Sequence, residues 1–184
     1  MAAYDSTAPE IPPRIKRAIK TLDAISDWSG HVVAWLVIPL MAVLVFEVIS
    51  RYVFDKPTLW AFDFTYMLYG AHFMLVSAFT LFKQGHIRTD FLYRTWSPKW
   101  QGIVDATLYL VLFLPAVSFF FWFSLEFAYE SWIQRETSFL SPWQPPIYPL
   151  KIALPMSAFL LFLQGIAEFL RSLYAAKHGR WHDL

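Results

Sequence analysis

The sequence predicts an all-α membrane protein with four transmembrane helices and an additional N-terminal amphipathic helix at the membrane interface. Three observations indicate this fold class. Hydrophobic residues make up 57% of the 184 positions and charged residues only 16%, whereas soluble domains carry about 25% charged residues. The apolar residues gather in four long segments. Most lysines and arginines lie before the first segment, between the second and third, or after the fourth, which is one side of the predicted membrane.

Each apolar segment is near the roughly 20 residues that cross the hydrocarbon core of a bilayer. The four segments run from about His31 to Phe54, Trp60 to Phe82, Ile103 to Ala128 and Ile147 to Leu170. Within each of them lies a long stretch without lysine or arginine. We therefore expect one four-helix transmembrane domain over residues 28–171. It is preceded by a disordered cytoplasmic N-terminus over residues 1–13 and followed by a cytoplasmic tail over residues 172–184.

The segment 14–27 has the pattern of an interfacial amphipathic helix. Apolar residues recur at helical spacing, at Ile15, Ala18, Ile19, Leu22 and Ile25. The remaining surface carries four cations, Arg14, Lys16, Arg17 and Lys20. A helix of this kind lies flat in the headgroup region, where its cations contact anionic membrane lipid. A solvated tail helix is the alternative interpretation.

The cations also predict the orientation, because lysine and arginine are enriched on the cytoplasmic side of a membrane protein. Of the 15 lysines and arginines, 11 lie before the first segment, between the second and third, or after the fourth. The opposite side has only Arg51, Lys56, Arg135 and Lys151. We therefore expect both termini in the cytoplasm. The N-terminus lacks the positive start and immediate apolar run of a signal peptide, so we expect it to be retained.

No catalytic or metal-binding constellation is present in the sequence. It has no cysteine, no His-Glu-x-x-His motif, no glycine-rich phosphate loop and no Gly-x-Ser-x-Gly elbow. The net charge of +1 provides no basic footprint for nucleic acid. We therefore expect no enzyme activity, no cofactor, no metal and no nucleic-acid partner.

A haem-bearing membrane anchor of a quinone-linked oxidoreductase is the main alternative function. Bis-histidine haem needs two histidines at one depth on facing helices, and His72 is the only histidine well inside an apolar segment. We expect His72 to hydrogen-bond to a neighbouring helix instead. A self-contained channel or small exporter needs a polar path across the bilayer, and the second and fourth segments lack strong charges at mid-depth.

Charges within the apolar segments are candidate partner contacts. Glu47 and Arg51 are four residues apart near the outer end of the first segment, so they share one helix face. Pairing offsets part of the insertion cost, which is about 2.5–3.5 kcal/mol for a lone charge at mid-bilayer. Asp63 is a candidate third member. A local ion pair and a contact with a partner chain both remain open, and Glu126 raises the same alternatives, with Arg135 as its local mate.

The sequence resembles the small, Q-type membrane subunit of tripartite ATP-independent periplasmic (TRAP) transporters over roughly residues 28–171. The first segment ends in Glu47-Val-Ile-Ser-Arg51-Tyr-Val-Phe54, followed by Pro57, Trp60 and Asp63. After the second segment comes Gly85-His86-Ile87-Arg88-Thr89-Asp90, similar to the Gly-His-Ile-Arg-Val-Asp loop of the family. The fourth segment contains a Leu-Phe-Leu-Gln-Gly run. Thr89 replaces the usual valine, and Asp63 stands alone where family members often have a glutamate pair.

This resemblance implies a bacterial inner-membrane complex of three parts. A periplasmic binding protein captures an organic acid, and a large membrane subunit transports it with sodium by an elevator motion. The small subunit is then a fixed scaffold that packs on the large one. In this interpretation His86, Arg88 and Asp90 are candidate structural or partner contacts. The segment 138–149 contains four prolines and carries Trp143 and Pro146, so we expect it to touch the docked binding protein.

Overall fold

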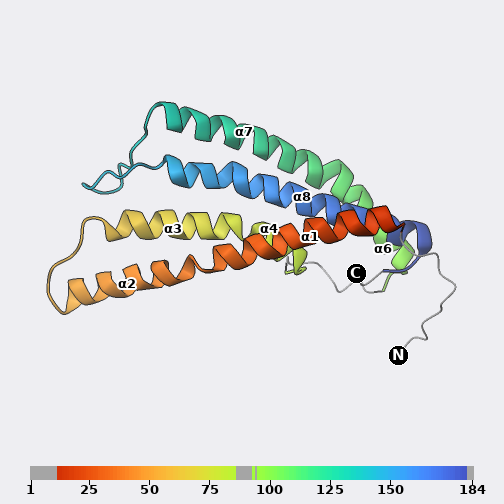
Figure 1. Cartoon of the computed structure of the whole chain (residues 1–184), viewed down its shortest axis with the longest axis horizontal. Coiled ribbons are helices and arrows are strands. Elements are labelled where there is room, and N and C mark those ends of the chain that lie inside the picture. The colour runs from red at the N-terminus through yellow and green to blue at the C-terminus, as the bar shows by residue number, and fades with distance from the viewer. Residues whose placement is uncertain (1–11, 86–92, 94, 182–184) are drawn as a thin grey trace.

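The protein is a bundle of long helices (Figure 1), described by a computed structural model over residues 12–85, 93 and 95–181. Four helical stretches in this described part are long and apolar enough to cross a membrane, which confirms the predicted fold class. No strand occurs among the described residues. The elements are α1 (Pro13–Ala34), α2 (Val37–Tyr52), α3 (Ala61–Leu75), α4 (Ser77–Phe82), α6 (Pro98–Leu108), η1 (Tyr109–Phe113), α7 (Leu114–Ile133) and α8 (Tyr148–His178).

The helices α1 and α2 follow one another almost in line (Figure 1) and together cover the 40 residues Pro13–Tyr52. They are separated only at Trp35 and Leu36, where backbone N–H groups bond three residues back, to Val32 and Val33. Pro39 explains this interruption, because its ring would clash with the carbonyl of Trp35 in a regular helix. At about 1.5 Å per residue the pair is about 60 Å long, twice the roughly 30 Å hydrocarbon core.

The amphipathic pattern predicted over residues 14–27 does form a helix, but this helix is the first half of α1. No break separates it from the residues that follow, since α1 continues to Ala34. Its apolar stripe packs on α4 and α8. Ile19 is completely buried and Leu22 and Ile25 are half-buried. Ile15 and Ala18 are exposed, so the apolar face that the sequence predicts for acyl chains packs on protein only in part.

The third span consists of α6, η1 and α7 and bends where the helix widens to a π-turn. Pro115 has no N–H group, so a regular ladder would lose one bond and its ring would press on the carbonyl four residues earlier. The N–H of Leu114 instead bonds to the carbonyl of Tyr109, five residues back. Such single π-turns are known sites of helix bending. The helix thus accommodates Pro115 by a π-turn directly before it.

The helix α8 is the centre of the bundle, because it contacts α7, α6, α3, α1 and α4. Its buried surface is made mostly of small residues, among them Ala153, Ser157, Ala158, Gly165, Ala167, Ser172 and Ala175. Small residues allow neighbouring helices to approach closely in a membrane. The ring of Phe113 packs on Gly165, and Gly102 of α6 lies directly against the backbone of α8 at Ala175 and Ala176. The other helices are therefore arranged around α8.

Candidate functional site

The outer end of α2 carries the ion pair that the sequence predicts. The guanidinium of Arg51 donates to Glu47 Oε1 from Nε at 2.9 Å and from Nη2 at 2.5 Å. The other carboxylate oxygen, Oε2, accepts from the backbone N–H of Thr58 at 3.1 Å and from the Thr58 hydroxyl. Glu47 therefore fixes the loop between α2 and α3 as well as its own helix neighbour.

Trp60 closes the same loop at the start of α3. Its indole stacks on Phe46 of α2 with ring centroids 5.9 Å apart, and the ring of Phe64 meets it edge-on at 6.2 Å. Offset and edge-on aromatic pairs of this kind add about 0.5–1.5 kcal/mol to the area that they bury. Trp60 thus holds the outer ends of α2 and α3 together.

Asp63 does not join the Glu47–Arg51 pair, so its candidate role as a third member is wrong. Its side chain is fully buried. One carboxylate oxygen accepts from the hydroxyl of Ser138 at 2.6 Å and the other from the hydroxyl of Ser141. A buried carboxylate needs such donors, and here they come from the loop between α7 and α8. Asp63 therefore anchors the proline-rich outer segment onto α3.

The proline-rich outer segment, residues 138–149, is held as a compact loop. The N–H of Ser138 bonds to the carbonyl of Pro145 at 2.7 Å, and the N–H of Ile147 bonds to that of Glu136 at 3.0 Å. The two serine hydroxyls that donate to Asp63 also accept loop N–H groups, those of Leu140 and Trp143. Trp143 is 47% exposed and Pro146 is exposed as well. Both predicted contact residues therefore lie on the outer surface of a fixed loop.

A second anchor joins this loop to α8. The ammonium of Lys151 pairs with the carboxylate of Glu136 and lies 3.8 Å from the ring centroid of Phe127 on α7. The hydrogen bond from Lys151 lowers the pKa of Glu136 below its ordinary value of 4.5. Three elements thus meet at Lys151.

His86, Arg88 and Asp90, the candidates from the segment after the second span, lie outside the described residues. His72 is described, and its ring Nδ1 lies 3.1 Å from the carbonyl of Val33 on α1. This confirms the predicted hydrogen bond to a neighbouring helix. Within the described ranges no group of three or more histidine, cysteine, aspartate or glutamate side chains is placed to hold a metal.

A buried polar network between α1 and α8 was not predicted from the sequence. Arg171 Nη1 donates to Glu168 Oε1 at 2.5 Å, and its Nη2 pairs with Asp23 of α1. The amide of Gln164 donates to Asp23 at 3.2 Å and to Glu168 at 3.1 Å. The i, i+4, i+7 spacing of Gln164, Glu168 and Arg171 was the available signal, since it places all three on one face of α8.

The comparison with protein-family models identifies the class of protein. Residues 40–174, which are well over half of the chain, match the family described as tripartite ATP-independent periplasmic transporters, DctQ component. The chain belongs to this family. A comparison with curated proteins found no match.

DctQ membership makes this chain the small membrane subunit of a TRAP transporter, as the sequence motifs predicted. The matched range contains the Glu47–Arg51 pair, Trp60, Asp63 and the whole outer segment. DctQ is a family of transport components and not of enzymes, so neither it nor the hydrogen bond of His72 supports the haem-anchor alternative. The four apolar helical stretches of this chain are those of a multi-pass membrane protein.

Proposed function

We propose that this chain is the fixed scaffold subunit of a sodium-driven uptake system for an organic acid. In this role it packs on the large transport subunit and helps to dock the periplasmic binding protein. Membership of the DctQ family is the observation that carries the proposal. We place the protein in the bacterial inner membrane with both termini in the cytoplasm, on the strength of its 11-to-4 asymmetry of cations.

The bundle has wide apolar surfaces for a membrane partner. Leu40 is the only buried residue of α2, and large side chains such as Phe46, Val48 and Ile49 are about half exposed. Helix α7 likewise exposes Phe119, Trp122 and Phe123. Lipid covers part of this surface, and we assign the rest to the large subunit.

Glu126 is the candidate polar link in that contact. It lies on the exposed surface of α7, about two helical turns before the end at Ile133. No cation of the described residues pairs with it, and Arg135, its candidate local mate, makes no ion pair with it. A carboxylate inside the apolar layer is costly unless paired. We therefore expect a lysine or arginine of the large subunit opposite Glu126.

Glu126→Gln tests this link, with Glu130→Gln as the matched control because Glu130 is also exposed and lies one turn nearer the outer end. We expect Glu126→Gln to reduce the amount of large subunit that co-purifies by about tenfold, which corresponds to about 1.4 kcal/mol. Glu130→Gln should leave the yield unchanged. Equal yields for both variants and the wild type would contradict the assignment.

The outer segment is the proposed contact for the binding protein. It exposes Phe139 and Trp143, and its two anchors at Asp63 and Lys151 fix it before a partner arrives. A fixed loop loses little conformational entropy on binding. Exposed aromatic residues are also common anchors of protein interfaces. Phe139→Ala with Trp143→Ala should raise the concentration of binding protein that gives half-maximal uptake.

Reconstituted vesicles test the complete role. Vesicles that contain the large subunit, the binding protein and a sodium gradient should take up substrate only when this chain is present. The outer-segment variant should regain the full rate when excess binding protein is added, because it changes docking and not transport. Full-rate uptake without this chain would refute the scaffold role.

A further inference from the structure

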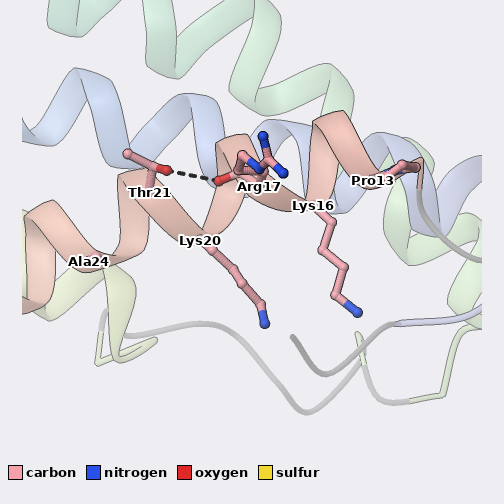
Figure 2. Close-up of a pocket in the computed structure, with 6 residues that line it drawn as sticks. All are labelled: Pro13, Lys16, Arg17, Lys20, Thr21 and Ala24. Carbon is pink, nitrogen blue, oxygen red and sulfur yellow. Dashed lines mark hydrogen bonds between the residues drawn. The ribbon is translucent and has the colours of Figure 1, made fainter.

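One face of α1 carries a cationic stripe that the packing of the bundle leaves uncovered. Lys16, Arg17 and Lys20, together with Pro13, Thr21 and Ala24, line a shallow hollow of about 450 Å³ (Figure 2). These six positions follow the i, i+3, i+4, i+7 spacing of a single helix face. In Figure 2 the side chains of Lys16 and Lys20 extend from the same side of the helix.

The stripe has no anionic partner in the described part of the chain. Thr21, which also lines the hollow, donates its hydroxyl to the backbone carbonyl of Arg17 at 3.0 Å. The two acidic residues of the same helix pair with other cations, Asp23 with Arg171 of α8 and Asp27 with Lys83. Three adjacent cations on an open surface attract a multivalent or delocalised anion such as a phosphate group.

The height of the stripe follows from the pairing of α1 with α8. Asp23 lies level with Arg171 because their side chains form an ion pair. Arg171 is 23 residues, about 35 Å, from the outer start of α8 at Tyr148. The hydrocarbon core is about 30 Å thick and the polar layers bring the bilayer to about 40–45 Å. Lys20 and Arg17 precede Asp23 in α1 and lie further toward the inner side. They are therefore in the headgroup layer on that side.

Exposed tryptophans mark the same level independently. Gly102 of α6 contacts α8 at Ser172, Ala175 and Ala176, and Trp100, two residues before it, is 62% exposed. Trp181 follows the end of α8 and is 38% exposed. Tryptophan is enriched at the level of the lipid headgroups. The inner ends of α6 and α8, and the part of α1 beside them, thus lie in that layer.

We propose that the cationic stripe Lys16, Arg17 and Lys20 binds the phosphate headgroup of an anionic phospholipid. The lipid phosphate lies between the two lysines, and its acyl chains run along the exposed apolar surface of α1 beyond Trp28, which is 69% exposed. The site depends on membrane insertion and not on the proposed transport role. Both can therefore fail separately.

Titration of the purified full-length chain in neutral detergent tests the site. The probes are dihexanoyl-phosphatidylglycerol, dihexanoyl-phosphatidylcholine and inorganic phosphate, with bound molecules counted by native mass spectrometry. The test variant carries Lys16→Gln, Arg17→Gln and Lys20→Gln. The control variant also loses three exposed cations, through Arg14→Gln, Lys99→Gln and Lys177→Gln, none of which lines the hollow. A third variant, Lys16→Arg with Arg17→Lys and Lys20→Arg, keeps the charge.

We expect the wild type, the control and the charge-keeping variant to bind phosphatidylglycerol at least tenfold more tightly than the stripe variant, since each cation near anionic lipid contributes measurably. Circular dichroism should show the same helix content for all four proteins, because the stripe is exposed. Equal binding by the stripe variant would overturn the proposal. Equal binding of phosphatidylcholine would also overturn it, and displacement by inorganic phosphate at equal concentration would indicate a site for free anions instead.

Discussion

At the residue scale, buried polar side chains determine which helices meet. Asp63 is fully buried and accepts hydrogen bonds from Ser138 and Ser141, which lie 75 and 78 residues later in the chain. Gln164 is also buried and donates to Asp23 of α1 as well as to the buried Glu168 of its own helix. An unpaired polar group costs most in an apolar setting. Each of these side chains is therefore stable only when its partner element is in place.

The network at Arg171 predicts a strong effect of a single substitution. Arg171→Gln leaves the carboxylates of Asp23 and Glu168 buried without their cation and should lower the free energy of unfolding by about 3 kcal/mol. The triple variant Asp23→Asn, Glu168→Gln, Arg171→Gln carries no buried charge, so it should lose less. Thermal unfolding in detergent, followed by circular dichroism, measures both. A triple variant less stable than Arg171→Gln would contradict the prediction.

The outer anchor at Glu136 predicts a dependence on pH. Its pKa is lowered in the folded protein by the hydrogen bond from Lys151, so this contact stabilises the fold fully above pH 4.5. The stabilisation is lost as the pH falls through the lowered pKa. The wild type should therefore unfold at a higher temperature than Glu136→Gln at pH 7, and this difference should shrink as the pH is lowered below 4.5. A difference that stays the same over the whole range of pH in which the protein remains folded would show that the contact does not depend on the charge of Glu136.

At the scale of the helix, prolines and glycines set the shape of each element and the closeness of each contact. Pro39 separates α1 from α2, and Pro115 accompanies the π-turn of the third span. Pro155 lies inside α8, which nevertheless continues as one helix to His178. Gly102 allows the backbone of α6 to touch that of α8. A proline in the sequence thus indicates where a helix adjusts, whereas the form of the adjustment depends on the neighbouring helix.

Gly102 is the position where an added methyl group should be tolerated least. A Cβ at this site would lie closer than 3.0 Å to backbone atoms of Ala175, Ala176 and Ser172, which have little freedom to shift. We expect Gly102→Ala to lower the free energy of unfolding by about 1–3 kcal/mol. Gly70→Ala is the control, because its Cβ would meet only the side-chain end of Leu150, at 3.0 Å. Thermal unfolding of the two variants should separate them clearly.

At the scale of the whole molecule, the helices are longer than the membrane is thick. The stretch Pro13–Tyr52 has 40 residues and Pro98–Ile133 has 36, whereas about 20 residues cross the hydrocarbon core. The parts of α1 and α6 that exceed this length lie beside the end of α8 (Figure 1), and both helices pack on α8. The bundle therefore has a folded extension at the end that we predict to be cytoplasmic, whereas the opposite end is closed by the anchored loop.

Cysteine labelling tests the orientation of the molecule, since the chain has no cysteine of its own. Phe139 is 83% exposed on the outer loop, whereas Ser138 beside it is only 3% exposed and unsuitable as a probe. Cysteine at position 139 should react with an impermeant maleimide in intact spheroplasts. Cysteine at Thr95 or Lys177, both exposed, should react only after the membrane is opened. The reverse pattern would invert the predicted topology.

The sequence by itself determined the fold class, the four spans and the family of this protein. Long runs of apolar residues are stable inside the bilayer, so the spans follow from the sequence. The Glu47–Arg51 pair is local, because residues four apart lie one helical turn from each other. Only the tertiary structure decided the partners of Asp63, Asp23 and Arg171. These contacts join residues far apart in the chain, and many side chains of suitable chemistry compete for each. The apolar stripe of α1 illustrates the same limit, because its pattern suits lipid and protein equally and the packing on α8 determined its surroundings.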